Sequence, residues 1–309
     1  MNAGTRSLHG MLETTLSKDD ERITRIDISN HELDGRFGFA ADDEASTAFF
    51  HLCDAVLQCG RAARSNQRFI HRSFKEDGSI LTETDLAVSN ALLPEIARLY
   101  PGCNIVTEEV DLHSFDDGVP LTFILDPIDG TDSYSQGFPS WCIALGILDS
   151  SRQPCGGIVY APRFGIGQDD MFFCSMPGKA DVFMNGEPWK PLSHYDEPKQ
   201  MTAGSDILNH VDLGTFSGKL RVFGSGILHM TAPFAFSNID ACLTTKCYVW
   251  DVAAPHALAL KLGFEVAYID GSPVVYDDAL LVERKRFEKP ILVGNHNCLG
   301  YMERTFRLM

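Results

Sequence analysis

The chain has 309 residues, of which 44% are hydrophobic and 22% charged, a composition typical of a globular protein with a large core. Its 42 acidic and 26 basic residues give a formal net charge of -16, which disfavours nonspecific binding to nucleic acid or to an anionic membrane surface. An anionic substrate would therefore need the help of cations.

Nine cysteines, none of them in a Cys-x-x-Cys pair, indicate reduced thiols and a cytoplasmic location. The first residues lack a continuous apolar stretch, which argues against a secretory signal. No window approaches about 18 uninterrupted apolar residues, so no membrane span is expected. The sequence thus predicts a soluble cytoplasmic protein without a nucleic-acid or membrane partner.

The first predicted elements are helices. Residues 1–40 are polar and lack a sustained apolar period, so they are predicted as an N-terminal arm. Apolar residues recur at helical spacing in 42–64 and predict an amphipathic helix there. A second helix is predicted to begin at Thr82, with Asp85 in its first turn, and to stop at the Pro-Gly pair of 101–102.

Strand signals follow, as short runs rich in β-branched and aromatic residues separated by Gly, Pro and Asp. The predicted strands of this half are 104–109, 121–126, 140–148, 156–162 and 171–175. The Asn185-Gly186 pair then predicts a hairpin with a type I′ turn.

The second half alternates between strands and helices. Strands are predicted at 220–225, 240–245, 264–269 and 290–295, and helices at 226–237 and 250–263. Interleaved strands and helices indicate a layered α/β architecture. No linker rich in Pro, Gly or Ser separates the halves, so 41–195 and 196–309 are predicted as two intimate subdomains of one domain.

The stretch LDPIDGTDSY, residues 125–134, places two aspartates three positions apart with a proline between them. An apolar run delivers Asp126 to the end of a buried strand. Pro127 favours an extended backbone at Asp126 and fixes its own φ, so Asp129 can face back toward Asp126. The pattern predicts two neighbouring carboxylates at a strand end.

The rest of this motif can serve a metal-bound phosphate. The Ile128 carbonyl is a hard oxygen ligand, Gly130 allows close approach, and Thr131 falls where a helix could begin with free amides. A purely structural turn is the alternative interpretation of this stretch alone. A calcium loop of EF-hand type fits poorly, because acids at alternate positions are missing.

Further acids favour the metal interpretation. Glu108 and Glu109 end another predicted strand, and Asp251 begins a predicted helix. Singly, each fits a helix cap or a solvated charge, but together they form a set of hard oxygen ligands if the fold brings them together. Such a set suits Mg²⁺ or Mn²⁺.

These residues resemble the inositol monophosphatase family of magnesium-dependent, lithium-sensitive phosphatases. The motifs that carry the resemblance are DPIDGT at 126–131, WDVAA at 250–254, the pair Glu108 and Glu109, and KEDGSILTETD at 75–85. In this order they cover roughly residues 45–300. The resemblance implies an α/β sandwich of five layers, αβαβα, a small phosphorylated metabolite as substrate, and a homodimer.

The resemblance also implies the roles of individual residues. Its metal ligands would be Glu108, Asp126 and the Ile128 carbonyl for one Mg²⁺, and Asp126, Asp129 and Asp251 for a second, with a third, weaker ion at Glu108. Its catalytic residues would be Thr131, with Asp85 as its hydrogen-bond partner, and Glu108, which together orient and deprotonate the attacking water. Its substrate contacts would be Asp129, Gly130, Thr131, Gly224, Ser225, Thr244 and Asp251.

One segment departs from the family pattern. Inositol monophosphatases carry a glutamate shortly before the Trp-Asp aspartate, where this chain has Thr244 or Thr245, which argues against inositol phosphate as the substrate. A 3'-phosphoadenosine nucleotide phosphatase, a histidinol phosphatase and a fructose-1,6-bisphosphatase are alternatives on the same scaffold. A catalytically silent metal-binding scaffold and a paired-carboxylate glycosidase are alternatives of other classes, although the latter needs two separated carboxyls.

Overall fold

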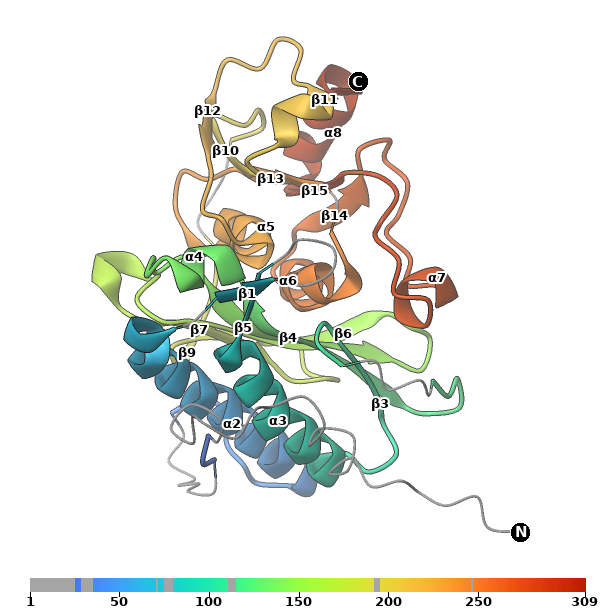
Figure 1. Cartoon of the computed structure of the whole chain (residues 1–309). Helices are drawn as coiled ribbons and strands as arrows, with labels where there is room; N and C mark the ends of the chain where they lie inside the picture. Colours follow the sequence, from blue (N-terminus) through green and yellow to red (C-terminus); the bar gives the residue numbers. More distant parts are fainter. Residues whose placement is uncertain are drawn as a thin grey trace.

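Helices and sheets alternate in five layers, as Figure 1 shows. The computed structural model describes residues 26–28, 36–70, 72–74, 80–110, 115–191, 195–245 and 247–309. Its helices are α2 (Glu44–Asn66), α3 (Glu83–Leu99), α4 (Thr131–Ser135), α5 (Gly226–Ala235), α6 (Val249–Lys261), α7 (Asp278–Leu281) and α8 (His296–Thr305).

Two sheets contain most of the strands. The seven-stranded sheet has the order β3 (Asn104–Thr107), β4 (Leu121–Asp129), β5 (Cys142–Asp149), β6 (Pro154–Ala161), β7 (Met171–Ser175), β8 (Phe183–Met184) and β9 (Glu187–Pro188). The five-stranded sheet has the order β12 (Lys219–Arg221), β10 (Gln200–Ala203), β13 (Ala241–Thr244), β15 (Ile291–Gly294) and β14 (Glu265–Tyr268). Two short pairs join β1 (Arg72–Phe74) to β2 (Ile80–Thr82) and β11 (Val211–Asp212) to β16 (Arg307–Leu308).

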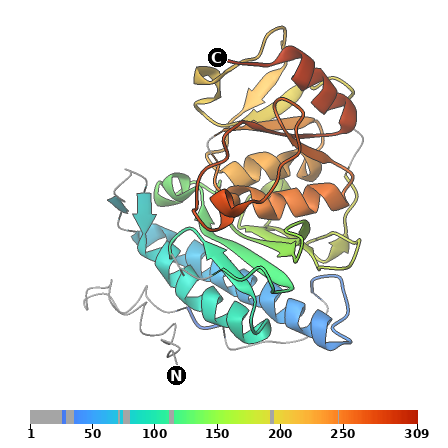
Figure 2. The same ribbon diagram turned by 90° about the vertical axis from the view of Figure 1, so that its right-hand side faces the viewer.

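The layers follow from where each helix buries its apolar side. The helices α2 and α3 cover one face of the seven-stranded sheet, α5 and α6 lie between the two sheets, and α8 covers the outer face of the five-stranded sheet (Figures 1 and 2). Three clusters of buried apolar residues fill the spaces between these layers. The predicted αβαβα sandwich is therefore confirmed.

Individual elements agree with the sequence to different degrees. The strand predicted at 171–175 matches β7, and Asn185 and Gly186 have φ angles of 51° and 84°, as a type I′ turn requires. The strand predicted at 220–225 is shorter, because β12 ends at Arg221. The strand β10 and the helices α7 and α8 were not predicted.

The described part of the predicted arm packs against the rest of the chain. Phe37 is buried in the cluster under α2 and α3, and Ile26, Ile28 and Phe39 pack against this cluster. Residues 1–25 and 29–35 lie outside the described residues. Among the described helices, none combines the length and the apolar character that a membrane span requires.

Candidate active site

The strand β4 ends in a β-bulge that brings two aspartates to one face. Side chains of a regular strand alternate, so residues three apart, such as Asp126 and Asp129, would point to opposite faces. In the pairing with β5, however, Asp126 lies opposite Ala144 and Asp129 opposite Cys142, so three steps along β4 match two along β5. The extra residue falls in the interval that contains Pro127, which has no amide for the ladder. The bulge thus restores a common side for both carboxylates.

Glu108 reaches the same edge of the sheet from the parallel neighbour β3. Thr107 pairs with Leu125 of β4, and the Glu108 amide donates to the Leu125 carbonyl at 3.3 Å. Parallel strands end at the same edge, so Glu108 follows β3 close to where Asp126 follows Leu125. The two acidic motifs therefore meet in space.

Asp251 comes from the middle helical layer, in the first turn of α6. Gly146 of β5 lets this helix approach the sheet closely, since a Cβ there would lie 2.5 Å from a side-chain atom of α6. Carboxylate oxygens of Asp126, Asp129 and Asp251 lie within 4.8 Å of one another. Three of the predicted metal ligands, from two layers, thus form one cluster.

Asp129 is held by the first turn of α5. Its carboxylate accepts hydrogen bonds from the Ser225 hydroxyl and from the amides of Ile227 at 2.7 Å and Gly226 at 3.3 Å. Ser225 is 1% exposed and also caps α5, accepting from the Leu228 amide at 3.1 Å. Its hydroxyl is thus engaged with Asp129 and with the helix end, so it positions a carboxylate of the cluster.

Thr131 and Asp85 lie beside the cluster and contact each other. The Thr131 hydroxyl lies 3.2 Å from Oδ1 of Asp85 and 2.8 Å from the Ile128 carbonyl, and either oxygen can accept its proton. Asp85 is fully buried, and its Oδ2 accepts from the amide and the hydroxyl of Thr82 at 2.9 and 2.5 Å, which caps α3. The predicted Thr131–Asp85 contact is present; residues 75–79 of the same motif lie outside the described residues.

Burial and mutual repulsion change the protonation of these acids. Burial raises the pKa of Asp126 well above its ordinary value, and the negative charges of Glu108, Asp129 and Asp251 raise that pKa further. Burial likewise raises the pKa of Asp251 well above its usual range. It raises the pKa of Asp129 to about 6 and that of Asp85 to about 7. A bound cation would relieve this repulsion.

One oxygen in the cluster has an unmet need for a partner. Asp126 is 1% exposed, and within the described structure its Oδ1 has no hydrogen-bond partner. A buried polar atom without a partner is costly, so it indicates a ligand that supplies one. Carboxylate and carbonyl oxygens are the ligands of Mg²⁺ and Mn²⁺, so the donor set fits a divalent metal. Glu108, the remaining predicted carboxylate ligand, lies outside the group of three and is half-buried.

Gly130 makes a sharp turn between β4 and α4. Its φ is 82°, and a Cβ there would lie 2.8 Å from the Ser140 carbonyl oxygen and 3.1 Å from that of Gly224. A side chain at this position would therefore be both strained and obstructed. The helix α4 begins at Thr131, as the sequence predicts. Gly224, the exposed residue before Ser225, thus lies against the DPIDGT motif.

Thr244 ends β13 and points into the protein. It is 4% exposed, and its hydroxyl lies 3.0 Å from the Cys247 thiol. The Thr245 hydroxyl donates to Asp206 at 3.4 Å. Both hydroxyls at the position of the missing glutamate are therefore engaged by protein groups.

Arg284 contacts the site and was missed by the sequence analysis. Its guanidinium donates to the carbonyls of Glu108 at 2.7 Å and Val110 at 2.9 Å, and lies 5.2 Å from the centre of the Trp250 ring. It thereby joins the glutamate segment to the first turn of α6. The run ERKRFEK at 283–289 was the available signal, because it concentrates basic residues in an acidic chain.

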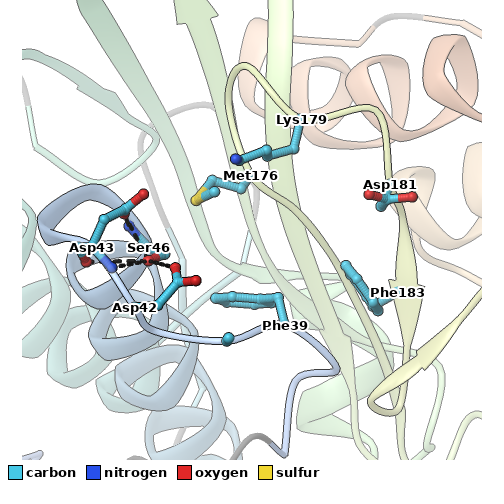
Figure 3. A pocket seen from close by; sticks show the side chains of 9 residues that line it. Phe39, Asp42, Asp43, Ser46, Met176, Lys179, Asp181 and Phe183 are labelled. Atoms are coloured by element: carbon cyan, nitrogen blue, oxygen red, sulfur yellow. Dashed lines mark hydrogen bonds between the residues drawn. The ribbon is translucent and has the colours of Figure 1, made fainter.

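A pocket of about 240 Å³ lies apart from this site, between the entry to α2 and the β7–β8 connection (Figure 3). Its lining includes Phe39, Asp42, Asp43, Ser46, Met176, Lys179, Asp181 and Phe183. Asp43 and Ser46 already cap α2 by bonding each other. None of the predicted site residues lines this pocket.

The comparisons with known proteins agree with the motifs. A model of the inositol monophosphatase family matches residues 43–295. The chain belongs to the inositol monophosphatase family. Among family members, inositol monophosphatase 1 of Solanum lycopersicum is 30% identical over 151 residues, 48% of this chain and 53% of that protein. The chain matches only about half the length of this relative and of inositol monophosphatase 3 from the same plant.

Other members of the family align over more of the chain. The 3'(2'),5'-bisphosphate nucleotidase CysQ of Aggregatibacter actinomycetemcomitans is 25% identical over 268 residues, 79% of this chain and 92% of that protein. The structure of staphylococcal inositol monophosphatase-1 superposes with a TM-score of 0.70 at 18% identity, covering 86% of this chain and 96% of that one. The layered fold is therefore the fold of the family.

Proposed function

We propose that this chain is a phosphomonoesterase that depends on divalent metal and hydrolyses a small phosphorylated metabolite. The observation that carries the proposal is the cluster of Asp126, Asp129 and Asp251, whose oxygens lie within 4.8 Å of one another. The partnerless buried oxygen of Asp126 and the adjacent Thr131–Asp85 pair support it. Membership of a family whose relatives are named as phosphatases adds further support.

The acids would hold Mg²⁺, with Mn²⁺ as a substitute. The ligands are Asp126, Asp129 and Asp251, together with Glu108 and the Ile128 carbonyl. Two ions bound there would neutralise the phosphate and activate water, which resolves the conflict between an anionic substrate and a protein of charge -16. A third ion at Glu108 is part of the same proposal.

The remaining groups of the site would handle the proton and the phosphate. Thr131 Oγ1 would accept a hydrogen bond from the attacking water while it donates to Oδ1 of Asp85. With its pKa raised to about 7 by burial, Asp85 can take up a proton near neutral pH. The amides of Gly130 and Thr131 would donate to the phosphate oxygens.

The leaving group would lie toward Gly224 and the Thr244 segment. Relatives in the family are named for inositol phosphate, for fructose 1,6-bisphosphate and for bisphosphate nucleotides. Because Thr244 or Thr245 stands where the inositol enzymes carry a glutamate, and their hydroxyls contact Cys247 and Asp206, we favour a leaving group other than inositol. The family resemblance further supports a homodimer, which sedimentation equilibrium of the purified chain would test.

Phosphate release from a substrate panel tests the proposal. The panel is inositol 1-phosphate, fructose 1,6-bisphosphate, 3'-phosphoadenosine 5'-phosphate, histidinol phosphate and β-glycerophosphate, each with Mg²⁺, with chelator and with added Li⁺. We expect Mg²⁺-dependent release from at least one of them. Asp126→Asn should lower this activity on the order of 10²-fold or more, because it removes a charged ligand from the centre of the cluster.

The matched control is Asp169→Asn, the same change at an exposed aspartate away from the acids. It should retain full activity. Release that persists in chelator, or in Asp126→Asn, would contradict the proposal. A chain that binds Mg²⁺ but hydrolyses none of the panel would support the silent-scaffold alternative instead.

A further inference from the structure

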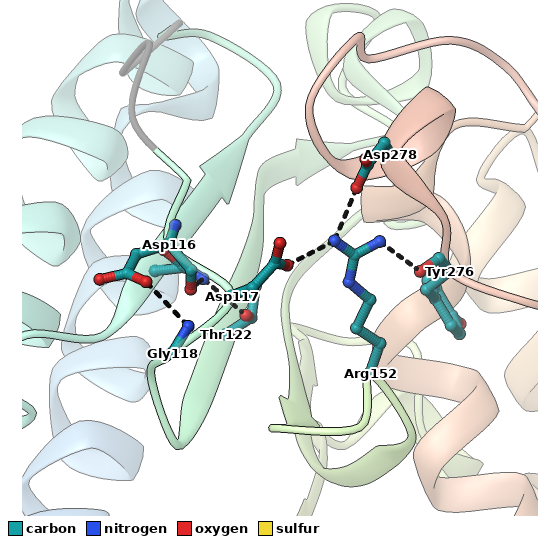
Figure 4. A network of polar contacts seen from close by, with 8 residues as sticks. Asp116, Asp117, Gly118, Thr122, Arg152, Tyr276 and Asp278 are labelled. Atoms are coloured by element: carbon teal, nitrogen blue, oxygen red, sulfur yellow. Dashed lines mark hydrogen bonds and ion pairs between the residues drawn. The ribbon is translucent and has the colours of Figure 1, made fainter.

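The segment from Tyr276 to Phe287, which carries α7, is fastened to the core at its beginning. Arg152, at the turn between β5 and β6, pairs with Asp278 and with Asp117 at 2.6 Å each and donates to the Tyr276 carbonyl at 3.4 Å (Figure 4). Its guanidinium also lies 5.2 Å from the ring of Phe115. One arginine thus joins this segment to the loop before β4.

The end of the segment is fastened beside the acidic cluster. The Phe287 amide donates to the Cys247 carbonyl at 2.9 Å, and Arg284 donates to the Glu108 and Val110 carbonyls. Phe287 itself is buried. Residues 284–287 are therefore held between the glutamate segment and the start of α6. This constrains the backbone that carries Arg286.

Arg286 is the residue before Phe287 in this constrained stretch. It is exposed, and its guanidinium lies 4.7 Å from the centre of the Tyr248 ring, which in turn stacks on Trp250 at 4.6 Å. The Tyr248 amide donates to the Asp251 carboxylate at 2.6 Å, so Tyr248 contacts both Arg286 and an acid of the cluster. The Arg286 charge also lowers the pKa of Asp251, against the larger effect of burial.

Arg286 differs from its basic neighbours, whose charged groups are bound by other groups of the protein. Lys285 pairs with Glu283 at 2.5 Å, Lys289 pairs with Asp270 at 2.5 Å, and Arg284 is bound to carbonyls. Within the part of the chain that the structure describes, Arg286 has no hydrogen bond or ion pair, and its guanidinium lies over the ring of Tyr248. Stacking on an aromatic ring covers the face of a guanidinium and leaves its N–H edge free.

We propose that Arg286 determines specificity by binding a second phosphate of the substrate, on the leaving group. The inference rests on the proposed function and adds the substrate class: a bisphosphate in preference to a monophosphate. A guanidinium matches phosphate with two parallel hydrogen bonds, and its stacking on Tyr248 holds it in place before substrate arrives. Within the described residues, no ion pair accounts for this exposed cation beside a cluster of acids.

Matched substrate pairs test this inference on the full chain with Mg²⁺. The pairs are adenosine 3',5'-bisphosphate with adenosine 3'-monophosphate, and inositol 1,4-bisphosphate with inositol 1-phosphate. Wild type should prefer the bisphosphate of at least one pair by tenfold or more in kcat/KM, on the order of one charge-assisted phosphate contact. Arg286→Gln should remove this preference through KM while leaving the monophosphate within about twofold, and Arg286→Lys should restore part of it.

Lys285→Gln is the control, because it removes the neighbouring exposed cation, which is already paired with Glu283. It should leave both substrates unchanged, and thermal unfolding should verify that each variant is folded. If wild type hydrolyses the monophosphates and Arg286→Gln affects both members of a pair equally or neither, the inference fails while the proposed function stands. If wild type hydrolyses none of the four compounds and none of the panel above, the proposed function fails and this inference with it.

Discussion

Single residues of the site differ in how far the sequence could reveal them. The DPIDGT motif predicts Asp126 and Asp129 as neighbours because Pro127 restricts the local backbone. The contact of Thr131 with Asp85 was predicted from the resemblance, and the structure contains this contact. The role of Ser225 in holding Asp129 could not be predicted, because the two residues lie 96 positions apart and only the packed layers join them.

We expect the buried acids to give the protein a pH-dependent stability that added divalent metal changes. Burial raises the pKa of Asp85 from the ordinary value of 3.8 to about 7 and that of Asp129 to about 6. Between about pH 4 and 7 the folded form therefore binds more protons than the unfolded form, so the free energy of unfolding of metal-free protein should fall as pH rises. Denaturant titrations in chelator at several pH values measure this slope.

Asp85→Asn is the control for the pH effect, since asparagine can still accept at the helix cap but does not titrate. The decline between pH 4 and 7 should be shallower in this variant than in wild type. Added Mg²⁺ should oppose the decline in wild type, because cations bind the ionised form. Wild type and Asp85→Asn having the same slope in chelator would contradict the assigned pKa shift of Asp85.

At the scale of elements, the sequence predicts what local pattern determines. The strand β7 and the turn at Asn185 are set by alternation and by residues that tolerate positive φ, and both were predicted. The bulge in β4 is less local, because it is defined only against the register of β5. The segment around α7 could not be assigned a role, because Arg284 and Arg286 gain their meaning from Trp250 and Tyr248 in another element.

Arg284 should act as a positioning residue between two elements. Its removal frees the Glu108 segment from α6. Arg284→Ala should therefore raise the Mg²⁺ concentration for half-maximal activity by about tenfold, the effect of losing a group that orients a metal ligand. Arg284→Lys should not rescue this, because an ammonium cannot reproduce the planar fork that reaches two carbonyls. Calorimetric titration with Mg²⁺ in the absence of substrate gives an independent measure of affinity.

The matched control is Arg98→Ala, which removes an arginine whose bonds within the described residues go to Glu95 on the same helix. Metal affinity should be unchanged there. A loss of thermal stability in Arg284→Ala with normal Mg²⁺ affinity would show that this arginine only stabilises the fold.

At the scale of the whole molecule, alternation of strands and helices was enough to predict layers, but not the order of strands within them. In the five-stranded sheet β13 pairs with β10 in parallel and with β15 antiparallel, although β14 precedes β15 in the chain. Such an order depends on long-range packing that no local pattern encodes. The central cluster of apolar residues contains members of both sheets and of α5 and α6.

Because both predicted subdomains contribute to this central cluster, we expect the chain to unfold in one cooperative step. Tryptophan fluorescence follows Trp141 in the outer cluster and Trp250 in the central one, while far-UV circular dichroism follows all helices. The two signals should give coincident guanidinium transitions. Separate midpoints would show that residues 41–195 and 196–309 fold as independent units.

The division of the acidic cluster between β4 and α6 also has a consequence for the order of events during synthesis. Asp126 and Asp129 leave the ribosome long before Asp251, and domains generally fold as units during synthesis. The nascent chain can therefore carry two of the three acids without possessing the proposed cation site. Metal loading would be a late event, which follows translation of α6 and coincides with the closing of the central layer.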